Sequence, residues 1–154
     1  MAFQNGKILI SVDPYEDAEN SFDWYTKYLH HPSNEIVVLH VPEGFDLDKA
    51  QKDLAKSGQM KESMEKTYSK ITELEERYNH KLHTGGLKGR VISVPSKSAG
   101  KTIIEVAKEE AAFAIVMGTR GRNKLQKALL GSVSDFVVKN AEVPVIVVRR
   151  PEFK

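Results

Sequence analysis

Five short segments of the chain are almost continuously apolar. Valine, isoleucine and leucine dominate residues 7–12, 35–41, 90–94, 113–118 and 143–149. A strand that is apolar at consecutive positions, and not only at alternate ones, is typical of a parallel sheet that is covered on both faces. The pattern therefore predicts five buried β-strands.

Between these segments the apolar residues recur every three or four positions, which is the spacing of one face of an α-helix. The first series is Ala18, Phe22, Tyr25 and Leu29. A longer helix is expected over residues 56–82, with an apolar face of Leu54, Met60, Met64, Tyr68, Ile71, Tyr78 and Leu82. Two further helices are marked by Ile103, Ile104 and Ala107, and by Val133, Phe136 and Val137. Strands and helices thus alternate, which predicts a doubly wound α/β sandwich, and the length of 154 residues fits a single domain over 1–154.

Composition narrows the possible chemistry. The chain has no cysteine, which excludes a disulfide framework, a thiolate metal site and a cysteine nucleophile. We expect a cytoplasmic protein, because the N-terminus lacks the pattern of a signal peptide and no apolar run approaches the roughly 20 residues of a membrane span. The net charge of +2 gives no reason to expect a nucleic-acid partner, and we expect no membrane partner either.

Positive charge nevertheless gathers in one quarter of the chain. Residues 117–154 hold eight Lys and Arg against three Asp and Glu. This quarter contains the glycine-rich stretch "GTRGRNKLQKALLGSVSD", residues 118–135. A basic loop attracts anions, although a solvated basic surface turn has the same composition.

The glycines of this stretch favour an anion site. Gly118 follows the fourth apolar segment, and ligands of open α/β sheets bind beyond the carboxyl ends of the strands. Glycine lets the backbone approach a ligand closely, and successive N–H groups in such a turn bind anions. Gly131 and Ser132 open the next helix, whose first amides are also anion-binding donors. We expect Ser132 to cap this helix, with Asp135 completing an approximate capping box.

The spacing Gly-x2-Gly-x9-Gly-Ser, filled by Gly118, Gly121, Gly131 and Ser132, resembles the nucleotide signature of ATP-binding universal stress proteins. The flanking segments are also similar to that family: "KILISVD", which ends in Asp13, "IVVLHV", "AIVMGTRG" and "GSVSDFVVKNAEVPVIVVRR". The chain departs from the family pattern in the turn "PSKSAGKT" and at Ala112 and Phe113, outside the signature.

The resemblance implies a five-stranded parallel sheet of order 3-2-1-4-5 that binds ATP together with Mg²⁺. It places Asp13 and the backbone of Val41 against the adenosine moiety. The ribose and phosphates would be surrounded by Met117, Gly118, Arg120, Gly121, Gly131, Ser132 and Val133. The resemblance also implies a homodimer through the last strand, Val143 to Arg149.

The expected function is an ATP-binding stress-response regulator that acts as a nucleotide-dependent switch with unknown protein partners. Little or no hydrolysis is expected, because no candidate general base lies beside the glycine loop and no His-x-Gly-His motif occurs. Two alternatives remain open. One is a nucleotide-independent interaction module, and the other is a slow ATPase.

Other signals have simpler interpretations. Residues 95–102, "PSKSAGKT", resemble a Walker A loop, but Pro95 stands at the first glycine position and has no N–H to donate. An ordinary strand–helix connection is the favoured interpretation. The five histidines show no metal-ligand spacing that carboxylates support, and His80 and His83, which could share a helix face, are favoured as part of a solvated surface. Asp13 has an alternative role as a cap for the helix that begins near Pro14.

Overall fold

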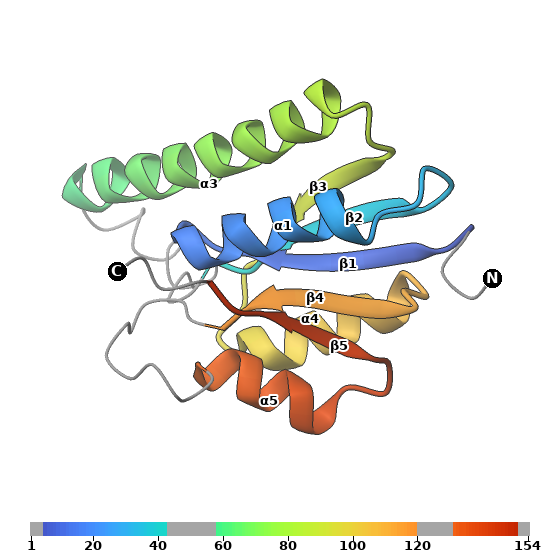
Figure 1. The fold of residues 1–154 in the computed structure, drawn as a ribbon. Helices are drawn as coiled ribbons and strands as arrows, with labels where there is room; N and C mark the ends of the chain where they lie inside the picture. The colour runs from blue at the N-terminus through green and yellow to red at the C-terminus, as the bar shows by residue number, and fades with distance from the viewer. Residues whose placement is uncertain (1–4, 43–57, 120–130, 151–154) are drawn as a thin grey trace.

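The architecture is a five-stranded parallel sheet between two layers of helices (Figure 1). The structure is a computed structural model and describes residues 5–42, 58–119 and 131–150. The strands are β1 (Lys7–Val12), β2 (Glu35–His40), β3 (Gly89–Ser93), β4 (Ala114–Gly118) and β5 (Val145–Val148). Their order in the sheet is β3-β2-β1-β4-β5, and every neighbouring pair is parallel. The predicted fold class and strand order are confirmed.

Helices cover both faces of the sheet. They are α1 (Glu16–Tyr28), α3 (Gly58–Thr84), α4 (Ala99–Glu109) and α5 (Ser132–Asn140). Helices α1 and α3 pack on one face and α4 and α5 on the other, as Figure 1 shows. None of the helices in the described residues is long and apolar enough to cross a membrane.

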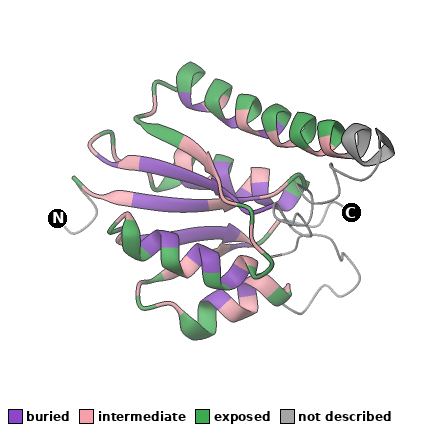
Figure 2. Cartoon of the chain, turned by 180° about the vertical axis from the view of Figure 1, so that it is seen from behind, coloured by how far each residue is buried: buried purple, intermediate pink, exposed green. Residues whose placement is uncertain are grey.

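The apolar strands explain this arrangement. Side chains alternate between the faces of a strand, so Ile8 and Ile10 of β1 join the core beneath α1 and α3, whereas Leu9 joins the core beneath α4 and α5. The central strands are buried along nearly their whole length (Figure 2). The outer strands β3 and β5 are mostly half-buried, because each has a neighbour on one side only.

Helix α3 is buried over a shorter length than the sequence predicts. Its buried apolar side chains are Leu74, Tyr78 and Leu82, whereas Tyr68 is 45% exposed and Ile71 is half-buried. The N-terminal part of α3 extends past the end of the sheet, so no strand lies beneath it (Figure 1). The predicted contacts of Leu54 and Met60 fall outside the described side chains.

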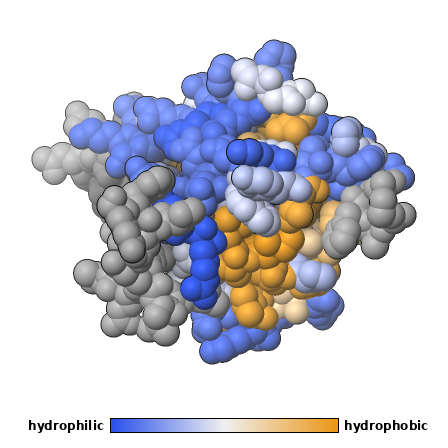
Figure 3. All heavy atoms as spheres, in the orientation of Figure 1, coloured by the Kyte–Doolittle hydropathy of each residue, from blue (hydrophilic) through white to orange (hydrophobic). Residues whose placement is uncertain are grey.

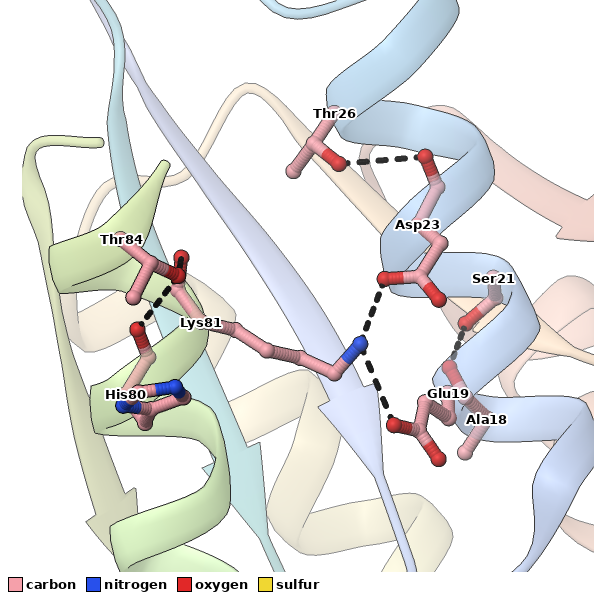
Figure 4. A network of polar contacts seen from close by, with 8 residues as sticks. All are labelled: Ala18, Glu19, Ser21, Asp23, Thr26, His80, Lys81 and Thr84. Carbon is pink, nitrogen blue, oxygen red and sulfur yellow. Dashed lines mark hydrogen bonds and ion pairs between the residues drawn. The ribbon is translucent and has the colours of Figure 1, made fainter. Parts of the chain in front are cut away.

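Helix α3 is joined to α1 by one cation and one aromatic pair. Lys81 Nζ lies 2.8 Å from Asp23 Oδ1 and 3.1 Å from Glu19 Oε1 (Figure 4). Burial alone would lower the pKa of Lys81, but hydrogen bonds to Asp23 and Glu19 raise it above its ordinary value. Beneath these two ion pairs, the rings of Phe22 and Tyr78 pack edge to face, with their centroids 5.4 Å apart. The two helices of this layer therefore contact each other as well as the sheet.

Candidate functional site

The carboxyl ends of β1, β2 and β4 meet at one edge of the sheet. Val12 pairs with His40 in the register of β1 with β2, and Ile10 pairs with Val116 in the register of β1 with β4. Asp13 and Val41, which directly follow β1 and β2, and Gly118, the last residue of β4, therefore lie at neighbouring strand ends. After β1 the chain leads to α1 on one face of the sheet, and after β4 it leads to α5 on the other face. Open α/β sheets bind ligands where neighbouring strands diverge in this way.

Asp13 is held at this edge by the turn that leads into α1. Its Oδ1 accepts a hydrogen bond of 2.8 Å from the Tyr15 amide. The helix begins at Glu16 with Tyr15 as its N-cap, and no side chain caps it. Asp13 thus stabilises the turn before the helix and does not cap the helix itself. This contact orients the carboxylate at the end of β1.

Val41 and Met117 reach the same edge through their backbones. Val41 directly follows β2 and is 8% exposed, while Met117 is the next-to-last residue of β4 and is 5% exposed. Both side chains belong to the core beneath α4 and α5. Their contribution to this edge therefore consists of main-chain groups.

Gly118 is needed for the close packing of α1 against β4, a role that the sequence did not predict. A Cβ at this position would lie 2.7 Å from the carbonyl oxygen of Asp17, closer than real Cβ contacts allow. The first turn of α1 can approach the end of β4 only because residue 118 has no side chain. The glycine therefore serves the fold as well as any ligand.

The start of α5 differs from the prediction in its cap. The N-cap is Gly131 and not Ser132, and no side chain caps the helix. Asp135 does not fold back to complete a capping box, because its carboxylate pairs with Lys139 one turn later at 2.9 Å. The side chain of Ser132 is exposed in the first turn, and Val133 beside it is half-buried.

The two ends of the predicted glycine loop are joined directly. The Gly131 amide donates a hydrogen bond of 2.7 Å to the Thr119 carbonyl oxygen. The hydroxyl of Ser134, a buried residue, lies 3.0 Å from the Gly131 carbonyl oxygen and 3.3 Å from that of Thr119. The sequence analysis missed both Thr119 and Ser134. The predicted site residues Arg120 and Gly121 lie outside the described residues.

The strand ends and the start of α5 carry different hydrogen-bonding groups. The first amides of α5 have no acceptor within the helix and carry its partial positive charge, and they lie beside the end of β4. The carboxylate of Asp13 and the backbone at Val41 supply acceptors on the β1–β2 side. Donors and acceptors in this arrangement suit a ligand with an anionic end and a hydroxyl-bearing end. In the described part of the chain, no three His, Cys, Asp or Glu side chains gather as a metal site.

A polar cluster lies behind Val41. His40, the last residue of β2, is only 5% exposed, and its Nδ1 is 3.5 Å from Ser93 Oγ. That hydroxyl donates a hydrogen bond of 2.9 Å to Glu75 Oε1 on α3. Burial lowers the pKa of His40, and the charge of Glu75 opposes this effect. The cluster links β2, β3 and α3 next to the candidate site.

Arg150 lies at the same edge of the sheet, beside the start of α1. It follows β5, forms an ion pair with Glu16 and lies 3.9 Å from Asp17 Oδ1. The cation therefore lies over the first turn of α1, next to the end of β4. Periodicity gave no signal for this contact, because its partners are separated by more than 130 positions in the chain.

The Walker-like segment serves helix packing. Helix α4 begins at Ala99, and Gly100 is buried in its first turn. A Cβ at Gly100 would lie 2.4 Å from Cδ1 of Phe136 on α5. This glycine permits α4 and α5 to pack closely, which supports the interpretation of residues 95–102 as an ordinary strand–helix connection.

Comparison with known proteins identifies the family. The model of the universal stress protein family matches residues 4–149. Universal stress protein MJ0531 of Methanocaldococcus jannaschii is 39% identical over 60% of this chain, a region that spans half of that relative's length. Universal stress protein MJ0577 of the same organism is 28% identical over 97% of this chain and 98% of its own length.

Solved structures agree with this match. The structure of MJ0577 has a TM-score of 0.79 at 26% identity and covers 97% of this chain and 99% of its own. A universal stress protein family member from Arabidopsis thaliana, solved with AMP bound, has a TM-score of 0.68 at 18% identity over 95% of this chain and 92% of its own. With strand order and family model in agreement over nearly its whole length, this chain belongs to the universal stress protein family.

Proposed function

We propose that the chain is an ATP-binding stress-response regulator whose nucleotide lies in the crevice at the carboxyl ends of β1, β2 and β4. The observation that carries this proposal is the meeting of three strand ends with the N-terminus of α5, joined by the hydrogen bond from Gly131 to Thr119. Family members solved with AMP bound and in complex with cAMP support an adenine nucleotide as the ligand class.

Each side of the crevice receives a part of the nucleotide. The amides at Gly118, Ser132 and Val133, with the Ser132 hydroxyl, bind phosphate oxygens through the donors of the α5 N-terminus. Asp13 accepts hydrogen bonds from ribose hydroxyls, and the Val41 backbone contacts the base. Arg120 and Gly121, from the same signature, complete the phosphate site. Mg²⁺ is held by phosphate oxygens and water.

The bound nucleotide acts as a switch and is hydrolysed slowly or not at all. Phosphoryl transfer needs a positioned nucleophile and stabilisation of the developing charge. Asp13, the acid that follows β1, accepts a hydrogen bond from the Tyr15 amide and is assigned to the ribose. Nucleotide occupancy then stabilises one arrangement of the strand-end segments.

The active form is a homodimer through β5. This strand is the outermost of the sheet, so one row of its N–H and C=O groups has no strand partner within the sheet. Val145, Ile146 and Val147 are only half-buried. An apolar surface spreads over the region where β5 runs, as Figure 3 shows in the orientation of Figure 1. A second β5 would cover this surface and pair the strand edge.

Thermal unfolding with and without Mg-ATP tests the nucleotide proposal. A ligand at 100 times its dissociation constant adds about 2.7 kcal/mol to the free energy of unfolding, so we expect a clear rise in Tm. Gly131→Val should abolish this rise and leave the unliganded Tm nearly unchanged, because the backbone angles of residue 131, φ −62° and ψ 159°, suit valine.

Lys139→Ala, in the last turn of the same helix, is the matched control and should keep the full rise in Tm. An unchanged wild-type Tm at millimolar Mg-ATP would contradict nucleotide binding. A full rise in the Gly131→Val variant would contradict the position of the phosphate site.

A further inference from the structure

The β5 edge is too small to hold two copies together by itself. The strand has four residues, Val145–Val148, whereas a stable interface buries about 800 Å² on each partner, contributed by roughly 20 residues or more. A dimer through this edge must therefore recruit the helices on both sides of the strand. On one face of the sheet the neighbouring helix is α1, which lies over β4 with β1 and β5 on either side.

One flank of α1 faces the β5 edge. Positions 17, 21, 24 and 28 recur at helical spacing and share this flank. Its first member, Asp17, touches the ends of β4 and β5 through Gly118 and Arg150. The opposite flank carries Glu19 and Asp23, which bind Lys81 of α3 (Figure 4).

Two aromatic residues occupy the flank toward β5. The rings of Trp24 and Tyr28 lie 5.7 Å apart. Trp24 is half-buried against the same core cluster as Ile146 of β5, and Tyr28 is 61% exposed. Tryptophan and tyrosine are enriched at protein interfaces, where they contribute large contact areas.

Symmetry fixes which side chains meet. Two antiparallel copies of one strand are related by a two-fold axis perpendicular to the sheet, so each face of the sheet continues into the same face of the partner. Ile146 belongs to the core on the α1 side and Val147 packs on the other side. A residue can face only a residue of the same side, so the axis passes beside a residue and not between two. The four-residue strand overlaps its copy most fully when that residue is one of its two central ones, Ile146 or Val147.

Trp24 lies close to this axis. Asp17 is level with the pair Gly118 and Val148 at the strand ends. Trp24 follows Asp17 by seven helical residues, which is about 10 Å along α1. Because α1 runs back along the sheet from the strand ends, this length corresponds to about three residues of β5. Trp24 is therefore level with Val145. The two α1 helices would stand about three strand spacings apart, roughly 14 Å. Helices in contact are about 8–10 Å apart, so large side chains are needed to bridge the difference.

Charge at the two ends of β5 favours an antiparallel second copy. Glu142, which also pairs with Lys108 of α4 at 3.1 Å, precedes the strand and Arg149 follows it, and both are exposed. An antiparallel partner places the anion of one copy near the cation of the other. A parallel partner would place like charges together.

We propose that Trp24 and Tyr28 of two copies pack against each other and close the α1 side of a β5–β5 dimer, an inference that rests on the homodimer proposed above. Trp24 of one copy then covers Ile146 and Trp24 of the partner subunit. The pair makes α1 part of the dimer interface as well as part of the nucleotide crevice, which its first turn borders.

Sedimentation velocity over a dilution series tests this proposal. Trp24→Ala and Tyr28→Ser should each raise the dimer dissociation constant by about tenfold or more, as loss of an interface aromatic does. Because Tyr28 is 61% exposed, Tyr28→Ser is expected to keep the monomer fold. Tyr68→Ser, which removes a 45% exposed aromatic from α3, is the matched control and should leave the dissociation constant unchanged.

The single tryptophan of the chain gives a second readout. Emission of Trp24 should shift to longer wavelength as dilution separates the dimer, and Val147→Glu should give the shifted spectrum at every concentration.

The outcomes separate the two proposals. A wild-type monomer at all concentrations would overturn the homodimer. A wild-type dimer that Val147→Glu breaks and that Trp24→Ala and Tyr28→Ser leave intact would overturn the aromatic closure alone. A dimer that survives all three substitutions would place the interface elsewhere and overturn both.

Discussion

His40, a buried residue beside the candidate site, makes the free energy of unfolding depend on pH. It ends β2, directly before Val41, and its ring lies near Ser93 and Glu75. Burial lowers its pKa below the ordinary 6.5. Between the folded and unfolded pKa values, the unfolded chain binds more protons than the folded one. The free energy of unfolding must therefore decrease as pH falls below about 6.5.

We expect His40→Gln to lose less stability than the wild type between about pH 7 and pH 5.5. Urea denaturation at the two pH values measures this difference. His83→Gln, at an exposed position of α3, is the control and should follow the wild type. His30, whose pKa burial also lowers, contributes to the pH effect that remains in the variant. Equal losses in His40→Gln and the wild type would contradict the role given to His40.

The residue scale is also where sequence reasoning succeeded least. The signature marked Gly118 and Gly131 at their observed strand and helix ends. It could not reveal that Gly118 lies against the Asp17 carbonyl, because that contact depends on how α1 folds back over β4. The cap assigned to Ser132 was wrong, because Gly131 takes the N-cap position and Asp135 pairs with Lys139.

At the scale of elements, the junction of α1 and α3 depends on Lys81. Its ammonium bridges Glu19 and Asp23 across the two helices (Figure 4). The side chain is 25% exposed, so solvent screens the interaction less than at a fully exposed pair. Without the cation, two carboxylates one turn apart on α1 would face each other without compensation.

We expect Lys81→Met to lower the free energy of unfolding by about 0.5–1 kcal/mol at low salt and by less in 1 M NaCl. Lys139→Met breaks the more exposed ion pair with Asp135 inside α5 and should cost less. Urea denaturation of both variants at the two salt concentrations gives the comparison. A loss for Lys81→Met that is equal to that of Lys139→Met, or unaffected by salt, would contradict the bridging role.

Elements were predicted well where local pattern determines them. Continuous apolar runs gave the five strands, and Lys7–Val12 agrees at both ends. Helix α3 shows the limit of the method. Periodicity placed Tyr68 on the apolar face, but burial also requires a strand beneath the helix, and the sheet ends before that point.

At the scale of the whole molecule, strand order came from family resemblance and not from periodicity. Alternating strands and helices predict a parallel sheet, yet several orders satisfy the same pattern. The observed order places β1 at the centre between β2 and β4 and leaves β5 at an edge. This order puts the crevice at one end of the sheet and the proposed dimer surface at its side, with α1 bordering both.

The most direct test of the nucleotide crevice is a titration of ¹⁵N-labelled protein with Mg-ATP, followed by amide chemical shifts. The account predicts that the largest changes occur at Val41, Gly118, Ser132 and Val133, at the carboxyl ends of the strands. The amides at the opposite end of the sheet, near Asn34 and Gly89, should stay unchanged. Absence of any change at saturating Mg-ATP, or changes centred on that opposite end, would contradict nucleotide binding in this crevice.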